Sequence, residues 1–112
     1  MKGGFLVYYP LSALLIECLI LSIVNKHDSY GYEISQTIKT VAAIKESTLY
    51  PILKKLTSDG YLSTYTETVN NRARKYYAIT DSGRTHLQYL EGEWLEYSNA
   101  IDAIIKEGPL ND

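Results

Sequence analysis

The sequence predicts a mainly α domain of the α+β class, in which three helices precede one β-hairpin and a long helix follows it. Three observations support this prediction: apolar residues recur at helical spacing in three segments before residue 60, two runs rich in Tyr, Thr and Val flank Asn70-Asn71, and a regular apolar stripe extends from Leu87 to Ile104. The chain has 112 residues, of which 46% are hydrophobic and 21% charged, and this composition is typical of one compact domain. The length excludes a catalytic domain beside a regulatory one.

The first helix is expected over residues 11–25, because Pro10 splits an apolar run that covers residues 5–24. A run of this length could instead span a membrane or act as a signal peptide. Glu17 near its middle and the lack of a small-residue cleavage site before Lys26 argue against both alternatives. The helix is apolar on nearly every side, so we expect it to need several neighbours, one of them from a second copy of the chain.

Two shorter helices are expected next. Ser29 is a suitable N-cap for the first of them, which extends to about residue 40. The following helix ends at Gly60, a residue suited to a helix C-terminus, and Pro51 inside it is expected to cause a kink. The apolar face of this helix consists of Leu49, Leu53 and Leu56.

Two strands are expected over residues 61–69 and 74–79, with Asn70-Asn71 as the turn, and Thr80 then caps a final helix that ends at Gly108-Pro109. This order of elements predicts a winged helix-turn-helix, with three helices, a two-stranded wing and a long C-terminal dimerisation helix. We assign residues 1–79 to the DNA-binding domain and residues 80–112 to the dimerisation helix. The glutamates that flank the apolar stripe lack basic counterparts, so packing onto another apolar helix is favoured over a parallel coiled coil. The stripe consists of Leu87, Leu90, Trp94, Tyr97, Ile101 and Ile104.

Charge is distributed unevenly along the chain, whose formal net charge is −2. Residues 1–44 are neutral, residues 45–77 carry six bases against three acids, and residues 78–112 carry two bases against seven acids. In this fold the third helix fits the major groove of DNA and the hairpin reaches the neighbouring backbone or minor groove. Solvated lysines and hydroxyls that satisfy first-turn backbone groups would show the same pattern. The candidate DNA contacts are Tyr30, Gly31, Lys45, Ser47, Thr48, Tyr50, Lys54, Lys55, Arg72, Arg74 and Lys75.

Three motifs in this order and at this spacing resemble the PadR family of transcriptional regulators. They are Tyr30-Gly31-Tyr32-Glu33-Ile34, Ser47-Thr48-Leu49-Tyr50-Pro51, and Arg74-Lys75-Tyr76-Tyr77 followed by Ile79-Thr80. The resemblance covers residues 11–105 and accounts for Pro51, which belongs to the family's pattern for the third helix. The chain departs from the family at Lys45, where a small capping residue is usual, and at the hairpin tip, residues 69–73, which lacks the usual glycines.

The single C-terminal helix is similar to the smaller branch of the family, which includes a multidrug-binding repressor whose last helix carries a tryptophan that lines a pore at the dimer interface. Trp94 falls at the matching position, although an aromatic residue on such a stripe can equally serve as core. The resemblance implies a site for a small aromatic or cationic ligand, lined by Leu14, Cys18, Ser22, Leu87, Glu91, Trp94 and Ser98. It also implies a dimer interface that includes Leu11, Leu15, Leu90, Tyr97, Ile101 and Ile104.

Enzymatic and metal-dependent functions are disfavoured. Cys18 is the only cysteine, so no disulfide framework is expected and a reducing, cytoplasmic setting fits best, and His27 and His86 lack metal-ligand spacing. No phosphate-binding glycine loop or nucleophile motif is present, and no cofactor is expected. We therefore predict a dimeric repressor of a palindromic operator. The alternative is a winged-helix module for protein interaction or ligand binding without sequence-specific DNA binding, which the pI of 5.6 keeps open.

Overall fold

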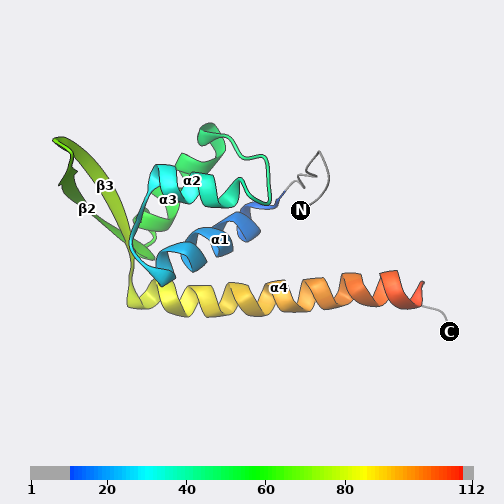
Figure 1. Ribbon diagram of the computed structural model, residues 1–112. Coiled ribbons are helices and arrows are strands. Elements are labelled where there is room, and N and C mark those ends of the chain that lie inside the picture. Colours follow the sequence, from blue (N-terminus) through cyan, green and yellow to red (C-terminus); the bar gives the residue numbers. More distant parts are fainter. Residues whose placement is uncertain (1–10, 110–112) are drawn as a thin grey trace.

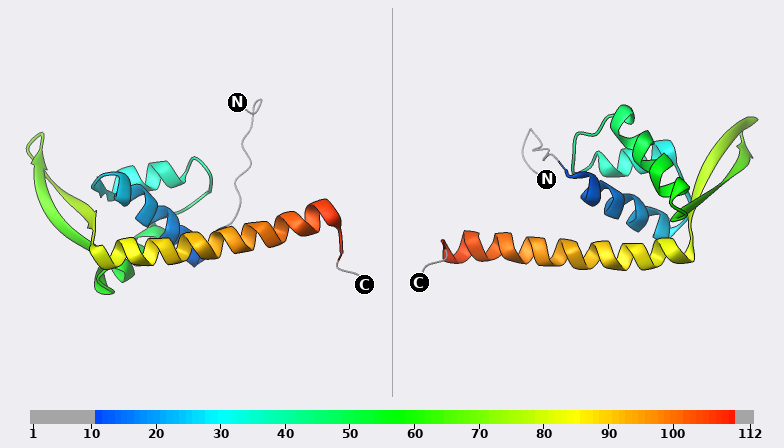
Figure 2. Two further views of the ribbon diagram at one scale, coloured as in Figure 1. Left: turned by 90° about the horizontal axis from the view of Figure 1, so that it is seen from below. Right: turned by 180° about the vertical axis from the view of Figure 1, so that it is seen from behind.

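The computed structural model describes residues 11–109, and over this range it forms four helices and a three-stranded antiparallel sheet (Figure 1). The order of the elements is that of a winged helix-turn-helix, as the sequence predicts. The wing projects at one end of the molecule and α4 extends beyond the other helices at the opposite end (Figure 2). The elements are α1 (Ala13–Lys26), β1 (Ser29–Tyr30), α2 (Gly31–Ile38), α3 (Glu46–Ser58), β2 (Leu62–Val69), β3 (Arg72–Ile79) and α4 (Asp81–Glu107).

Helix α1 is the centre of the core. Ser12 caps it by accepting a hydrogen bond of 3.2 Å from the Leu15 N–H. It packs against α2, α3, β3 and α4, so one protomer covers most of its apolar surface, and Leu14 remains exposed. Among residues 11–109 no helix is long and apolar enough to cross a membrane, and residues 5–10 of the apolar run lie outside this range.

The prediction for the start of α2 is wrong. Ser29 does not cap the helix but lies in β1, where it pairs with Tyr77, and its hydroxyl donates to the His27 carbonyl. Helix α2 begins at Gly31 with Tyr30 as an N-cap that makes no side-chain hydrogen bond. The sheet therefore has three strands in the order β1-β3-β2 instead of the predicted two, because a two-residue strand is too short to leave a recognisable pattern in the sequence.

Helix α3 continues through Pro51 to Ser58 and has Lys45 as an N-cap without a side-chain hydrogen bond. The wing that follows is longer than predicted, because β3 begins at Arg72 and pairs with β2 up to Val69. Asn70 and Asn71 both adopt left-handed backbone angles, with φ of 52° and 63°. This is the geometry of a two-residue hairpin turn, which asparagine tolerates without glycine.

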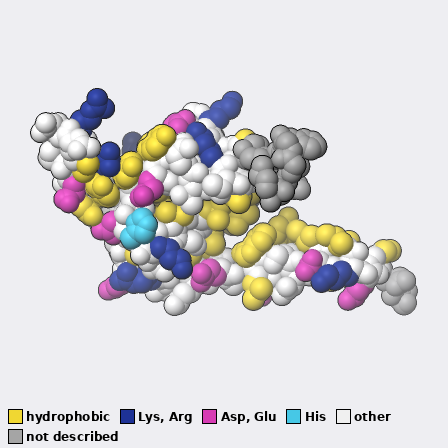
Figure 3. All heavy atoms as spheres, viewed as in Figure 1, with side chains coloured by type: hydrophobic (Ala, Val, Ile, Leu, Met, Phe, Trp, Pro, Cys, Tyr) yellow, Lys and Arg dark blue, Asp and Glu magenta, His cyan; other side chains and the backbone are white. Residues whose placement is uncertain are grey.

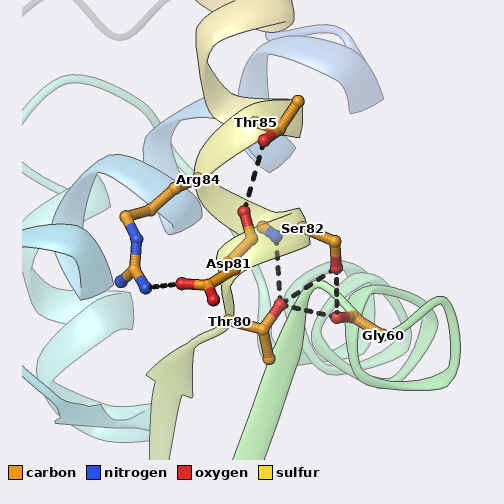
Figure 4. A network of polar contacts seen from close by, with 7 residues as sticks. Gly60, Thr80, Asp81, Ser82, Arg84 and Thr85 are labelled. Carbon is orange, nitrogen blue, oxygen red and sulfur yellow. Dashed lines mark hydrogen bonds and ion pairs between the residues drawn. The ribbon is translucent and has the colours of Figure 1, made fainter.

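The start of α4 is tied to the end of α3 (Figure 4). Thr80 caps α4 by accepting from the Gly83 N–H at 3.0 Å, and its hydroxyl donates to the Gly60 carbonyl at 2.6 Å. The Ser82 hydroxyl donates to the same carbonyl at 2.9 Å. Gly83 lies so close to Tyr61, the residue before β2, that a Cβ there would clash with the Tyr61 carbonyl oxygen. The first turns of α4 therefore share the core of the helix-turn-helix.

Candidate nucleic-acid interface and ligand cavity

Helix α3 has one buried face and one free face. Its three leucines are fully buried, whereas Ser47, Tyr50 and Lys54 lie on one exposed side with Thr48 beside them. Lys45 is exposed just before the helix, whose first-turn N–H groups lack a side-chain cap. Hydroxyls, an ammonium group and a helix N-terminus on one surface can bind phosphate oxygens and base edges.

Gly31 is buried and makes room for Tyr50. A Cβ at Gly31 would come within 2.6 Å of the Tyr50 hydroxyl oxygen, so the ring of Tyr50 can lie against the start of α2 only because residue 31 is glycine. Burial raises the pKa of Tyr77, and the nearby Tyr50 raises it further. The Tyr50 side chain of α3 thus lies against the first turn of α2.

The three cations of the wing do not share one face. Alternate residues of a strand point to opposite sides of a sheet. Lys75 lies on the side of buried Tyr77, with its ammonium 5.5 Å from that ring. Arg74 points to the outer side, where its guanidinium lies 4.1 Å from the centre of the Tyr30 ring. Arg72 at the tip is two positions away on the same strand and therefore points to the same side. Lys75 is therefore the wing cation that lies on the same side of the sheet as the helices.

An aromatic row crosses the outer side of the sheet. Tyr76 packs edge-on against Tyr30 and stacks on Tyr65, with ring centres 5.6 Å apart in both pairs. The Tyr65 hydroxyl donates to Asp28 at 2.7 Å, and this bond raises the pKa of Tyr65 to about 12. The sequence analysis did not identify this row, although each of the two predicted strands contains tyrosine, Tyr65 in one and Tyr76 in the other. The Tyr30 ring thus belongs to the outer side of the sheet.

Lys55 is placed differently from its neighbour Lys54. Its ammonium lies 3.2 Å from the Asp59 carboxylate and 3.4 Å from the carboxylate of Glu17. The hydrogen bond to Asp59 and the charge of Glu17 raise the pKa of the Lys55 amine. Glu17 is buried in α1 and also lies 3.6 Å from His86 of α4. The sequence analysis treated Glu17 only as an obstacle to a membrane span and missed these contacts.

An open cavity of about 470 Å³ lies between α1 and α4. Three residues predicted to contact a ligand line it, namely Leu14, Cys18 and Trp94, together with three predicted interface residues, Leu15, Leu90 and Tyr97. Ser12 and Glu93 complete the lining and were not predicted. The other four predicted ligand contacts, Ser22, Leu87, Glu91 and Ser98, do not line this cavity within one protomer.

Cys18 contributes a thiol to the wall of this cavity. Burial raises the pKa of the thiol, so the unreactive protonated form dominates at neutral pH.

Over residues 11–109, no group of three or more His, Cys, Asp or Glu side chains is arranged to hold a metal ion.

The distal part of α4 exposes a continuous apolar surface. Tyr97 is 62% exposed and Ile104 is 65% exposed, whereas Leu11 near the start of α1 packs against the core. Figure 3 shows hydrophobic side chains along one edge of the projecting part of α4, on the side of α4 on which the other three helices lie. The large apolar residues exposed on this part are Trp94, Leu95, Tyr97, Ile101, Ile104 and Ile105.

The sequence pattern of the "Transcriptional regulator PadR-like family" matches residues 20–89, more than half of the chain. The negative transcriptional regulator PadR of Bacillus subtilis is 30% identical over 98 residues, which is 83% of this chain and 52% of that protein. The chain therefore spans about half the length of this relative.

Two solved structures are also similar. The crystal structure of smu.1704 from Streptococcus mutans is 64% identical with a TM-score of 0.88, and the match covers 95% of this chain and all of that one. A PadR family transcription regulator from Clostridium difficile is 31% identical with a TM-score of 0.73, over 80% of this chain and 97% of that chain.

Proposed function

Because this chain belongs to the PadR-like family of transcriptional regulators, whose members are not enzymes, we propose that it is a homodimeric repressor that binds double-stranded DNA. In this proposal each copy presents one α3 helix and one wing to one half of a palindromic operator. A small aromatic or cationic ligand bound between the subunits weakens DNA binding.

The observation that carries the proposal is the exposed face of α3. Ser47, Thr48, Tyr50 and Lys54 are exposed around a helix whose opposite side is fully buried. The first three contact base edges or phosphates, and Lys54 contacts a phosphate. On the wing, Lys75 contacts the backbone beside α3, and Arg72 at the tip enters the minor groove. Arg74, Gly31 and Tyr30 act by holding neighbouring side chains, since Arg74 stacks on Tyr30 and Gly31 adjoins Tyr50.

The exposed apolar surface of α4 supports the dimer. Six large apolar residues within twelve positions are more than a monomeric protein leaves in water. A two-fold axis would bring this surface onto the same surface of a second copy, and that pairing would also cover the open side of the cavity. Trp94 then lies where two copies meet, which supports an aromatic ligand in this cavity, and the carboxylate of Glu93 favours a cationic one.

The test is fluorescence anisotropy with a labelled duplex from the region upstream of the gene, at two salt concentrations and beside a scrambled duplex. The proposal predicts tighter binding to the native duplex and a steep loss of affinity with salt. A planar aromatic cation that fills the cavity should lower this affinity by about 5- to 150-fold. Negligible binding to DNA at low salt would contradict the proposal and would favour a winged-helix module for protein interaction.

A further inference from the structure

Glu17 is a buried carboxylate in an otherwise apolar part of α1. Its side chain is 6% exposed, and its two oxygens contact two different helices. Oε2 lies 3.4 Å from the Lys55 ammonium of α3, and Oε1 lies 3.6 Å from Nε2 of His86 in α4. A buried carboxylate is costly unless a partner compensates its charge, so the contact with the Lys55 ammonium ties α3 to α1, and the His86 ring adds a polar neighbour from α4.

Both partners of Glu17 are held by further contacts. The His86 ring stacks on Tyr61 with ring centres 4.1 Å apart and planes inclined by only 7°. The Tyr61 N–H donates to the Leu56 carbonyl near the end of α3, and the Tyr61 carbonyl accepts from the Thr80 N–H before α4.

On α3, the Lys55 ammonium is also bound by Asp59. We call Glu17, Lys55, Asp59 and His86 the polar junction. It connects the second half of α3 to α1 and α4.

We propose that Glu17 is a positioning residue that sets the orientation of α3 relative to α4, and that Lys55 supports DNA binding through Glu17 and not by contact with phosphate. The inference rests on the proposed function, because α4 is there the dimerisation helix and α3 the recognition helix. Their relative orientation then fixes the spacing of the two recognition helices on the operator. Both the polar junction and the ligand cavity involve α1 and α4, but none of the four junction residues lines the cavity.

The surroundings of the two neighbouring lysines, Lys54 and Lys55, support this assignment. Lys55 lies within 3.4 Å of two carboxylates, whereas no ion pair involves Lys54 among residues 11–109. An ammonium that is already bound by two carboxylates is a poor ligand for a third anion. Lys54 therefore serves as the matched control, with the same chemistry on the same helix.

The experiment measures operator affinity over a range of salt concentrations for four variants: Lys54→Met, Lys55→Met, Glu17→Gln and the double variant Glu17→Gln/Lys55→Met. For each phosphate that a variant no longer neutralises, the slope of log K against log salt should fall in magnitude by about 0.9. Lys54→Met should show this change. Lys55→Met and Glu17→Gln should each weaken binding by about fivefold with the slope unchanged, and the double variant should lose clearly less than the product of the two. A slope change in Lys55→Met equal to that of Lys54→Met, or independent effects of Glu17→Gln and Lys55→Met, would overturn the inference.

The orientation of α3 can be measured directly. Nitroxide labels at Ser58→Cys in a Cys18→Ser background report the distance between the two α3 helices of a dimer. Glu17→Gln should shift or broaden this distance distribution, and Lys55→Arg, which keeps a cation beside Glu17, should leave both the distribution and the operator affinity close to those of the parent. An unchanged distribution in Glu17→Gln would overturn the inference. If Glu17→Gln does not fold, Lys55→Met and Lys55→Arg make the same comparison. A wild-type protein that binds no operator would instead refute the proposed function.

Discussion

The two halves of α4 carry the same apolar repeat but differ in what covers it. In the first half, Leu87 and Leu90 are only 4% and 3% exposed because α1 lies over them. In the second half, residues of the same stripe such as Tyr97 and Ile104 are mostly exposed. A regular repeat therefore predicts a face that has to be covered, and it does not indicate whether the cover comes from the same chain.

The largest loss of stability is expected from a substitution that separates the covered half of α4 from the core. Gly83→Ala places a Cβ 2.1 Å from the Tyr61 carbonyl oxygen and 2.8 Å from Cγ1 of Ile79, and a backbone atom cannot move away cheaply. We expect the free energy of unfolding to fall by about 2–3 kcal/mol, measured by urea denaturation at a fixed protein concentration.

Gly92→Ala is the matched control for this change. Gly92 is an exposed position near the middle of α4, and a Cβ there would meet no atom within 4 Å. Alanine is the better helix former, so this variant should be more stable than the wild type by about 0.5–1 kcal/mol. Equal stability of the two variants would show that the first turns of α4 are not packed as described.

The uncovered half is tested by placing a charge on its stripe. Ile101→Glu puts a carboxylate in the middle of the exposed apolar surface, and its burial between two copies would be unfavourable. The dissociation constant of the dimer should rise by about 100-fold, or roughly 2.7 kcal/mol, in sedimentation equilibrium. Helical content should stay unchanged, because α1 does not cover this part of α4.

The control for Ile101→Glu is Asn99→Glu, a charge added on the same part of the helix but outside the stripe. It should leave the dimer intact. A dimer that resists Ile101→Glu, or dissociates equally with Asn99→Glu, would contradict the assignment of the stripe as the interface.

The helix-turn-helix also contains a covered position, Gly31, which lies beneath the exposed side chain of Tyr50. Gly31→Ala would displace Tyr50 from the start of α2, since the added Cβ comes within 2.6 Å of the Tyr50 hydroxyl oxygen. We expect operator affinity to fall about tenfold, or roughly 1.4 kcal/mol. If Gly31 acts only by making room for Tyr50, then Gly31→Ala/Tyr50→Ala should bind no more weakly than Tyr50→Ala. A further loss in the double variant would assign Gly31 a contact of its own.

The sequence was sufficient for the order of the four helices and the two strands of the wing, because each helix has an apolar periodicity and Thr80 marks the start of α4. It was not sufficient for β1, since two residues have no period, nor for the start of α2 that depends on it. The candidate site was predicted residue by residue as a set of cations and hydroxyls. Which of them share a surface depends on tertiary contacts, and so Lys55 was grouped with Lys54 although Glu17, distant in sequence, binds it.

The smallest expected effect concerns Cys18, which lies in α1 against the cavity where the covered and uncovered parts of α4 meet. Because burial raises the pKa of its thiol and the thiolate is the nucleophile, iodoacetamide should alkylate it more slowly than free cysteine at pH 8. The rate should keep rising with pH after that of free cysteine has levelled off.

The same reaction reports on the second half of α4. If a partner subunit covers that half and the open side of the cavity, then Ile101→Glu, as a monomer, should react several times faster than the wild-type dimer at the same pH. Asn99→Glu should react at the wild-type rate. Equal rates for wild type and Ile101→Glu would mean that the cavity stays open to water in the dimer, and a ligand could then enter it without separating the subunits.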